Sequence, residues 1–187
     1  MDRFPHTRPF VRTLLAFGAG LALLAGTGTV PLAAEEPRSS EYSVKAAFIY
    51  NFFKFVDWKE DSSGDFVFCV KGEAPFISDF ANLKGKAVDG KKIVIRQVGE
   101  SEIVRCKALF ITSSEQGNIS RLMRESKALG ILTIGDTGGF GQKGVMINFY
   151  LDQNKVRFEI NPAAAEEAGI SISSKLLSLA TIVHSMP

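Results

Sequence analysis

Four short runs of apolar residues, separated by stretches with helix or turn signals, constrain the fold of this chain most. The runs are three to five residues long and lie at 66–70, 93–95, 108–111 and 131–134. Strands that are apolar at successive positions, instead of at every second one, are typical of a parallel sheet covered on both faces. The pattern therefore predicts an α/β fold.

The segments between these runs favour crossover connections. Pro75–Leu83 predicts a short helix between the first two runs. Ser113 with Gln116 predicts a capping box for a longer helix, which we expect Gly130 to end. A crossover connection between two parallel strands of one sheet is right-handed in nearly all proteins. We therefore expect a doubly wound, three-layer arrangement with a mostly parallel sheet.

The C-terminal third has a different pattern. Val145–Leu151 and Lys155–Ile160 are two apolar-rich strands separated by a turn of hairpin length, which predicts an antiparallel pair. Asn161 followed by Pro162 predicts a helix start. A last helix from about Ser173 is predicted by apolar residues at helical spacing. The predicted fold is thus a mostly parallel α/β sheet with a C-terminal antiparallel hairpin and flanking helices.

The segment Tyr42–Trp58 contains seven aromatic residues and predicts a helix capped by Ser39 or Ser40. Its apolar surface is broad enough to require burial on more than one side. It is either a core helix between the sheet and a second helix, or partly a subunit or partner interface. The candidate interface residues on this helix and the last one are Phe48, Phe52, Phe53, Trp58, Leu176 and Leu179.

The first 34 residues have the pattern of a signal peptide. Three arginines precede an uncharged stretch, Thr13–Ala34, that ends in small residues. We expect cleavage near Ala34, with a retained membrane anchor as the alternative. Residues 35–187 would then form a single domain in the periplasm, without stable membrane insertion after processing.

The charge balance of the expected mature chain argues against nucleic-acid binding. The whole chain has 22 basic and 20 acidic residues, and the first 34 residues contain three of the basic and one of the acidic ones. The remainder therefore has 19 of each. A neutral domain lacks the excess of basic residues that binding to phosphate backbones requires.

Export changes the meaning of the two cysteines, Cys69 and Cys106. In an oxidising compartment such a pair is more often bridged than free, although two separate buried thiols are the alternative. No histidine lies near either cysteine in the sequence, so the pair does not indicate a metal site.

Signals of catalysis are weak. The expected mature chain has one histidine, His184, close to its end, where a general base is hard to orient. Gly139, Gly141 and Gly144 spell a dinucleotide-binding motif, but a strand follows it where a helix is required, which indicates a loop with positive φ values. Asp136 follows the fourth run, where it is either a ligand contact or a turn residue. We predict no enzyme activity, no cofactor and no metal.

A basic and hydroxyl group of residues at the start of the last predicted helix is a candidate ligand-binding site for a small anion. Helix N-termini present free N–H groups that suit anions. In the alternative, the serines cap the helix and the lysine is solvated. The candidate residues are Arg157, Ser173, Ser174 and Lys175.

Four ordered segments resemble the YfiR-like family of periplasmic proteins. They are YSVKAAFIYNFFKFVDW at 42–58, LTIGDTGGFGQKGVMINF at 132–149, VRFEIN at 156–161 and ISSKLLSLA at 172–180. The segment that begins at Cys106 is similar to the family's cysteine-led strand. The resemblance covers nearly all of the expected mature chain.

This resemblance implies a non-catalytic repressor that binds the periplasmic domain of an inner-membrane diguanylate cyclase and lowers cyclic di-GMP synthesis. It also implies a homodimer, and a Cys69–Cys106 bridge of the family's type. A second cysteine pair of the family's namesake has no counterpart here. Some relatives are associated with sensor kinases instead. The alternative function is an envelope module that binds or senses a small ligand.

Overall fold

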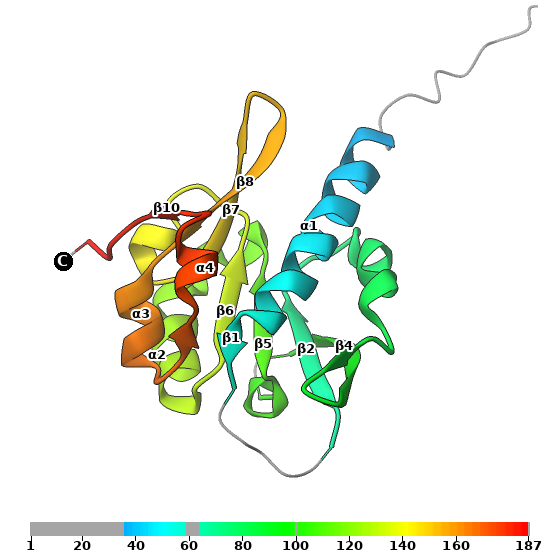
Figure 1. Ribbon diagram of the computed structural model, residues 1–187, viewed down its shortest axis with the longest axis horizontal. Coiled ribbons are helices and arrows are strands. Elements are labelled where there is room, and N and C mark those ends of the chain that lie inside the picture. The colour runs from blue at the N-terminus through cyan, green and yellow to red at the C-terminus, as the bar shows by residue number, and fades with distance from the viewer. Residues whose placement is uncertain (1–35, 59–63, 100, 187) are drawn as a thin grey trace, which may run out of the picture. The chain divides into compact units, whose positions relative to one another are not determined.

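An eight-stranded sheet forms the centre of the computed structural model, which describes residues 36–58, 64–99 and 101–186 (Figure 1). The strand order is β10-β8-β7-β6-β5-β2-β4-β3. The strands are β2 (Phe66–Lys71), β3 (Ala87–Val88), β4 (Lys91–Val98), β5 (Ala108–Ile111), β6 (Leu132–Gly135), β7 (Ile147–Asp152), β8 (Lys155–Ile160) and β10 (Thr181–Ile182).

The sheet is mostly parallel, as predicted. Strands β4, β2, β5, β6 and β7 run in one direction, whereas β3 and β8 are antiparallel to β4 and β7. A separate antiparallel pair joins β1 (Val56–Asp57) to β9 (Ser171–Ile172). The predicted fold class is therefore confirmed, and all four apolar runs lie in parallel strands.

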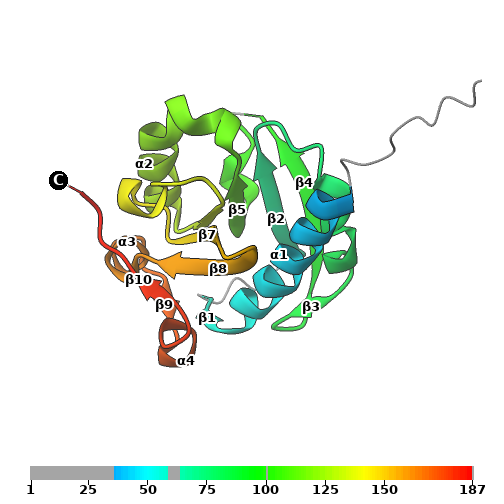
Figure 2. The same cartoon turned by 90° about the horizontal axis from the view of Figure 1, so that it is seen from above.

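Helices cover both faces of the sheet. The α-helices are α1 (Glu36–Lys54), α2 (Ile119–Leu129), α3 (Pro162–Glu167) and α4 (Ser174–Leu177), and the 3-10 helices are η1 (Ile77–Leu83), η2 (Ile103–Arg105), η3 (Ser113–Asn118) and η4 (Gly141–Lys143). Figure 2 shows α1 and α2 on opposite sides of the sheet. Two separate apolar clusters fill the spaces beneath them, as a doubly wound sheet requires.

Aromatic side chains of α1 make up much of the first cluster. The Phe52 ring lies 5.5 Å from the Phe149 ring and 4.9 Å from the Phe158 ring, measured between centroids. The Phe53 ring lies 4.7 Å from that of Phe66. Such offset and tilted aromatic pairs stabilise a core beyond their buried area. The aromatic segment is therefore a core helix.

The predicted limits of this helix were wrong at both ends. Ser39 and Ser40 lie inside α1, so neither is its cap. The helix ends at Lys54, because the next residues leave it to pair with β9, Val56 opposite Ile172. The Ser173 N–H also donates to the Phe55 carbonyl, at 2.9 Å. Pairing with a distant segment thus ends the helix.

The two helices predicted between strands, at 75–83 and from Ser113, are present, but neither begins as predicted. The segment after Pro75 is a 3-10 helix, in which Phe80 and Leu83 lie three residues apart and are both buried. The capping box at Ser113 is absent, because a 3-10 helix, η3, begins there and precedes α2. Gly130 ends α2 with φ 64°, as predicted.

The hairpin and the glycine loop are present as predicted, but β7 runs from Ile147 to Asp152 and not from Val145 to Leu151, so the turn has two residues. The turn between β7 and β8 uses Gln153 and Asn154 with φ 48° and 60°, which gives the strands the twist that a two-residue hairpin needs. Gly139 and Gly144 have φ 81° and 97°, as the predicted loop requires. The glycine motif therefore forms a turn between β6 and β7.

The last predicted helix was wrong. Only Ser174–Leu177 is helical, and Thr181–Ile182 forms β10 beside β8. The Val183 N–H donates to the Ile160 carbonyl at 2.9 Å, so the β-branched residues after α4 extend the sheet. None of the helices in the described part of the chain has the length and apolarity of a membrane span. Residues 1–34, predicted as a signal peptide, lie outside the described residues.

Asn161 fixes the C-terminal elements to one another. Its Oδ1 accepts from the Ala164 N–H at 3.1 Å and so caps α3, as predicted. Its Nδ2 donates to the Gly141 carbonyl and to Ser185 Oγ, both at 2.9 Å. The side chain is fully buried. One amide therefore joins α3, η4 and the C-terminal segment.

We predict that Asn161→Ala lowers the free energy of unfolding by about 2–4 kcal/mol, because the cap is lost and the Gly141 carbonyl loses its donor. Urea denaturation measures this change. Asn161→Asp keeps the cap acceptor but places a buried carboxylate oxygen against the Gly141 carbonyl, so it should be at least as destabilising as alanine. Equal stability of all three proteins would contradict this account.

Candidate functional site

The carboxyl ends of β2, β5 and β6 form the edge at which open α/β sheets usually bind ligands. The strand order reverses around β2, with β4 on one side and β5 on the other, and ligands bind at such a switch point. Lys71, Thr112 and Asp136 lie at or directly after the ends of these strands. A ligand site in this fold is therefore expected at this edge.

At the switch point, the chain's own polar groups bond to one another. Ser114 Oγ lies 2.9 Å from Thr112 Oγ1 and accepts from the Glu73 N–H, also at 2.9 Å. Gly72, with φ 99°, lies so close that a β-carbon would collide with the Thr112 and Ser114 hydroxyls. Gln97 Nε2 donates to the Gly72 carbonyl at 2.8 Å. The loop after β2 and the loop after β5 are thus packed directly together.

A buried charge cluster, comprising Glu41, Tyr42, Lys45 and Asp136, lies at the end of β6. Lys45 Nζ is 2.7 Å from Asp136 Oδ2 and 2.6 Å from Glu41 Oε1. The Tyr42 hydroxyl donates to the same Asp136 oxygen at 2.7 Å. The Lys45 and Asp136 side chains are 5% and 9% exposed. Asp136, predicted as a ligand contact or a turn residue, therefore anchors α1 to the sheet.

An aromatic stack supports this cluster. The Tyr42 ring lies parallel to the Phe76 ring with centroids 3.6 Å apart, and Lys45 Nζ is 4.2 Å from the Tyr42 centroid. The lysine therefore has two carboxylates and one ring as neighbours. Within the described ranges, no group of three or more His, Cys, Asp or Glu residues could hold a metal ion. The arrangement is suited to holding α1 in place.

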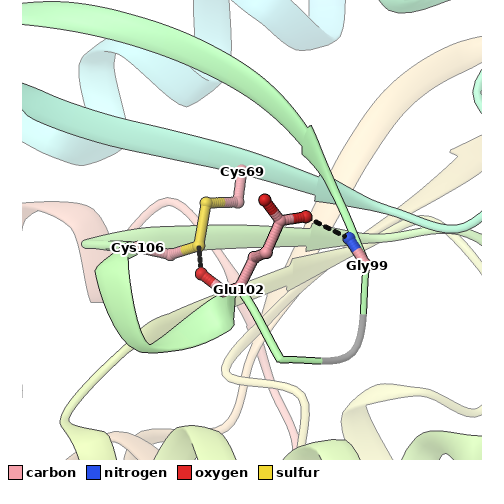
Figure 3. The surroundings of a disulfide bond; sticks show 4 residues. All are labelled: Cys69, Gly99, Glu102 and Cys106. Atoms are coloured by element: carbon pink, nitrogen blue, oxygen red, sulfur yellow. Dashed lines mark hydrogen bonds between the residues drawn. A yellow bond between two sulfur atoms is a disulfide. The ribbon is translucent and has the colours of Figure 1, made fainter.

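The predicted disulfide is present and joins Cys69 of β2 to Cys106, which directly follows η2 (Figure 3). Both cysteines are buried, at 0% and 5% exposure, with their Cα atoms 5.8 Å apart. Glu102 Oε2 accepts from the Gly99 N–H at 2.9 Å in the adjoining loop. The bridge therefore fixes the connection between β4 and β5 against the sheet.

The residues of the predicted anion site lie on two elements. Arg157 is on β8, opposite Tyr150, and its Nε is 3.9 Å from Asp152 Oδ2. Ser173 caps α4 by accepting from the Leu176 N–H at 3.3 Å, which is the alternative role that the sequence left open. Ser174 and Lys175 are exposed in α4. Anion binding by these residues stays a prediction.

The predicted interface residues divide by burial. Phe52, Phe53 and Leu176 have exposed fractions of 1%, 0% and 3%, so their side chains belong to the core. Phe48 and Trp58 are half-buried against it. Leu179 is 73% exposed, because the chain leaves the helix before this residue. Of this set, Leu179 is the side chain most available to a partner.

Further exposed apolar residues lie close to Leu179 in the sequence or on the neighbouring hairpin. The C-terminal apolar residues are Tyr150, Leu151, Leu179, Ile182 and Met186. A hydrogen bond of 2.8 Å between the Tyr150 hydroxyl and Thr181 Oγ1 joins the hairpin to β10. Sequence analysis missed the exposure of the hairpin residues and Ile182. The β-branched run at 181–183 was the signal that could have identified β10.

A family model described as YfiR/HmsC-like matches residues 42–181, which span the sheet from the aromatic helix to β10. The chain belongs to the YfiR/HmsC-like family. The match includes both cysteines and all residues of the buried charge cluster except Glu41. A search of curated proteins returned no match.

Solved structures share the fold at low sequence identity. A conserved domain protein from Vibrio cholerae O1 biovar eltor has 16% identity and a TM-score of 0.52, with 75% of this chain and 59% of that one covered. The ligand-free, open structure of CD0873, a substrate binding protein with adhesive properties from Clostridium difficile, has 10% identity and a TM-score of 0.53, with 76% and 60% covered.

A third structure, an ABC domain in complex with L-Trp from Streptococcus pneumonia, has 9% identity and a TM-score of 0.51, with 76% and 60% covered. The present chain thus spans about 60% of the length of each of these proteins. At such low identity the likeness shows a common fold alone.

We predict that replacing both cysteines by alanine lowers the free energy of unfolding by about 3.5–4 kcal/mol, because the bridge closes a 37-residue loop in the unfolded chain. Urea denaturation of the oxidised wild type and the double variant gives the difference. Thiol titration of the unfolded, nonreduced wild type should find no free thiol. Two titratable thiols would contradict the bridge.

We also predict that Asp136→Asn lowers the free energy of unfolding by about 2 kcal/mol or more, since Lys45 loses its most buried carboxylate partner. Glu41→Gln is the matched control. The Glu41 side chain is 25% exposed, and its removal should cost less than about 1 kcal/mol. Equal costs for the two variants would show that burial does not set the strength of these ion pairs.

Proposed function

We propose that this protein is a non-catalytic periplasmic regulator that binds the periplasmic domain of an inner-membrane diguanylate cyclase and represses it. The family match over residues 42–181 carries this proposal, since it supports a periplasmic regulator of diguanylate cyclase in broad terms. The disulfide fits an oxidising compartment. In the alternative, the partner is the periplasmic domain of a sensor kinase, and the binding experiment below distinguishes the two.

The arrangement of the carboxyl edge supports regulation by docking. Lys45 and Asp136 pair with each other and with their neighbours. The hydroxyl groups of Thr112 and Ser114, which follow β5, pack directly against Gly72. These polar groups hold secondary structure elements together. This arrangement fits a protein that acts on a partner through its surface.

Docking must be strong enough to change the state of the receptor. A regulator outside the membrane alters an enzyme inside it by favouring one conformation of the external domain. Moving a two-state receptor from mostly active to mostly inactive requires about 5.5 kcal/mol of differential binding. Free energies of that size come from a few large, well-packed side chains at the centre of an interface.

The C-terminal apolar residues are the exposed side chains that best meet this requirement. Leu151 and Leu179 are 53% and 73% exposed, and the Tyr150–Thr181 hydrogen bond holds the hairpin against the segment after α4. We assign the cyclase contact to this region. The family resemblance implies a homodimer, which is part of the same proposal. If the cyclase contacts the C-terminal apolar residues, the second copy of this chain binds elsewhere on the surface.

We predict that Leu151→Asp with Leu179→Asp reduces capture of the periplasmic cyclase domain at least about tenfold, because two apolar contacts are replaced by charges. Affinity purification of the tagged protein from solubilised membranes identifies the partner, and titration with its isolated external domain measures affinity.

Leu129→Asp is the control for this experiment. Leu129 is 45% exposed at the end of α2, and its substitution should leave capture unchanged. Loss of capture in the control would move the contact away from the C-terminal residues. Failure of the wild type to recover any integral-membrane sensor would overturn the proposed function itself.

A second candidate function, binding of a small envelope ligand, is favoured by one cavity. It has a volume of about 360 Å³ and lies among α3, β9 and α4, with Glu166 and Ser171 among its polar lining residues and Ile170 among its apolar ones. Its size is at the lower end of small-molecule sites. A ligand-induced rise in melting temperature without a protein partner would support this function.

A further inference from the structure

Positive charge is concentrated at one edge of the sheet in an otherwise neutral domain. Residues 84–98 contain five basic side chains and one acidic one, Asp89. Because residues 35–187 are balanced overall, the rest of this range has a net negative charge. The basic edge is formed by Lys54, Lys84, Lys86, Lys91, Lys92 and Arg96.

The positions of these side chains suit a flat partner. Alternate residues of a strand point to opposite faces, so Lys92 and Arg96 border one side of β4 and Lys91 borders the other. Strand β4 lies next to the last strand of the sheet, and β3 covers only Lys91 and Lys92 of it. A plane that lies against this edge therefore meets basic side chains from both faces of β4.

Tyr50 brings a further lysine to the same place. Its hydroxyl donates to the Ala87 carbonyl of β3 at 3.3 Å, and Figure 2 shows β3 beside α1. Lys54 Nζ and Lys86 Nζ lie 4.0 Å and 4.7 Å from the centroid of its ring. Two ammonium groups thus converge on one half-buried ring. Since like charges repel, a nearby anion would stabilise this arrangement.

The residue types favour a lipid surface over an acidic protein. Five of the six basic residues are lysines, which are depleted at protein interfaces, whereas arginine is enriched there. Lysine is a flexible point charge, which suits mobile headgroups. Charges on a sheet edge also discourage pairing with another sheet, but that role does not require Lys84 or Lys54.

We propose that the basic edge binds the anionic phospholipid headgroups of a membrane surface. The attraction is electrostatic, so it holds the protein at the membrane without inserting any part of it. Binding of this kind confines the search for a membrane receptor to two dimensions. Lipid binding of this kind depends on the distribution of charge and not on the identity of the protein partner.

The test is sedimentation of the purified protein with vesicles of phosphatidylcholine alone or with added phosphatidylglycerol. We expect at least about tenfold more binding to the anionic vesicles, and loss of that binding as NaCl is raised from about 50 mM to about 500 mM. Lys84→Gln, Lys86→Gln and Lys92→Gln in one protein should remove most of the binding. These three side chains are exposed, so the fold should tolerate the changes.

The matched control combines Arg124→Gln, Lys143→Gln and Lys155→Gln, which remove three exposed charges from other parts of the surface. It should bind anionic vesicles like the wild type. Equal binding to both kinds of vesicle, or equal loss in both triple variants, would overturn the proposal. So would an absence of vesicle binding at low salt together with lysine-dependent capture of an acidic protein domain, an outcome that leaves the proposed regulatory function intact.

Discussion

Burial of the aromatic side chains of α1 against the sheet is the interaction on which the rest of this structure depends. Phe52 and Phe53 are almost completely buried, and each buried phenylalanine contributes about 1.5–3 kcal/mol relative to an exposed one. Their rings contact rings of β2, β7 and β8. One helix therefore holds the parallel part of the sheet and the C-terminal hairpin together.

The buried ion pair and the disulfide extend this arrangement to the two ends of the strands. Lys45 and Asp136 fix the N-terminal half of α1 at the carboxyl edge, and Cys69–Cys106 fixes the connection before β5. Both contacts join elements that are distant in sequence. The surfaces left free by them are the C-terminal apolar residues and the basic edge, which lie toward opposite ends of the strand order. In the functions proposed above, the first surface contacts the receptor and the second contacts the membrane.

Sequence reasoning succeeded where local chemistry decides structure. The four apolar strands, the Asn161 cap, the Gly130 stop and the hairpin follow from side-chain period and backbone preference, which neighbouring residues do not override. It failed where a distant segment competes for the backbone. Residues 56–57 leave the predicted helix for β9, and residues 181–182 leave another for β8. The same competition separates Leu179 from Leu176, because the helix ends before Leu179, which is exposed while Leu176 is buried.

The α/β class, the order of the six main strands along the chain and the family resemblance follow from the amino-acid sequence alone, because these depend on which residue types follow one another. The pairing of Asp136 with Lys45, the core position of Phe52 and Phe53, and the gathering of six basic side chains at one edge are properties of the folded chain. Each of these depends on which distant segments lie side by side. Which segments lie side by side is determined by the packing free energy of the whole domain. That free energy cannot be calculated from any single segment.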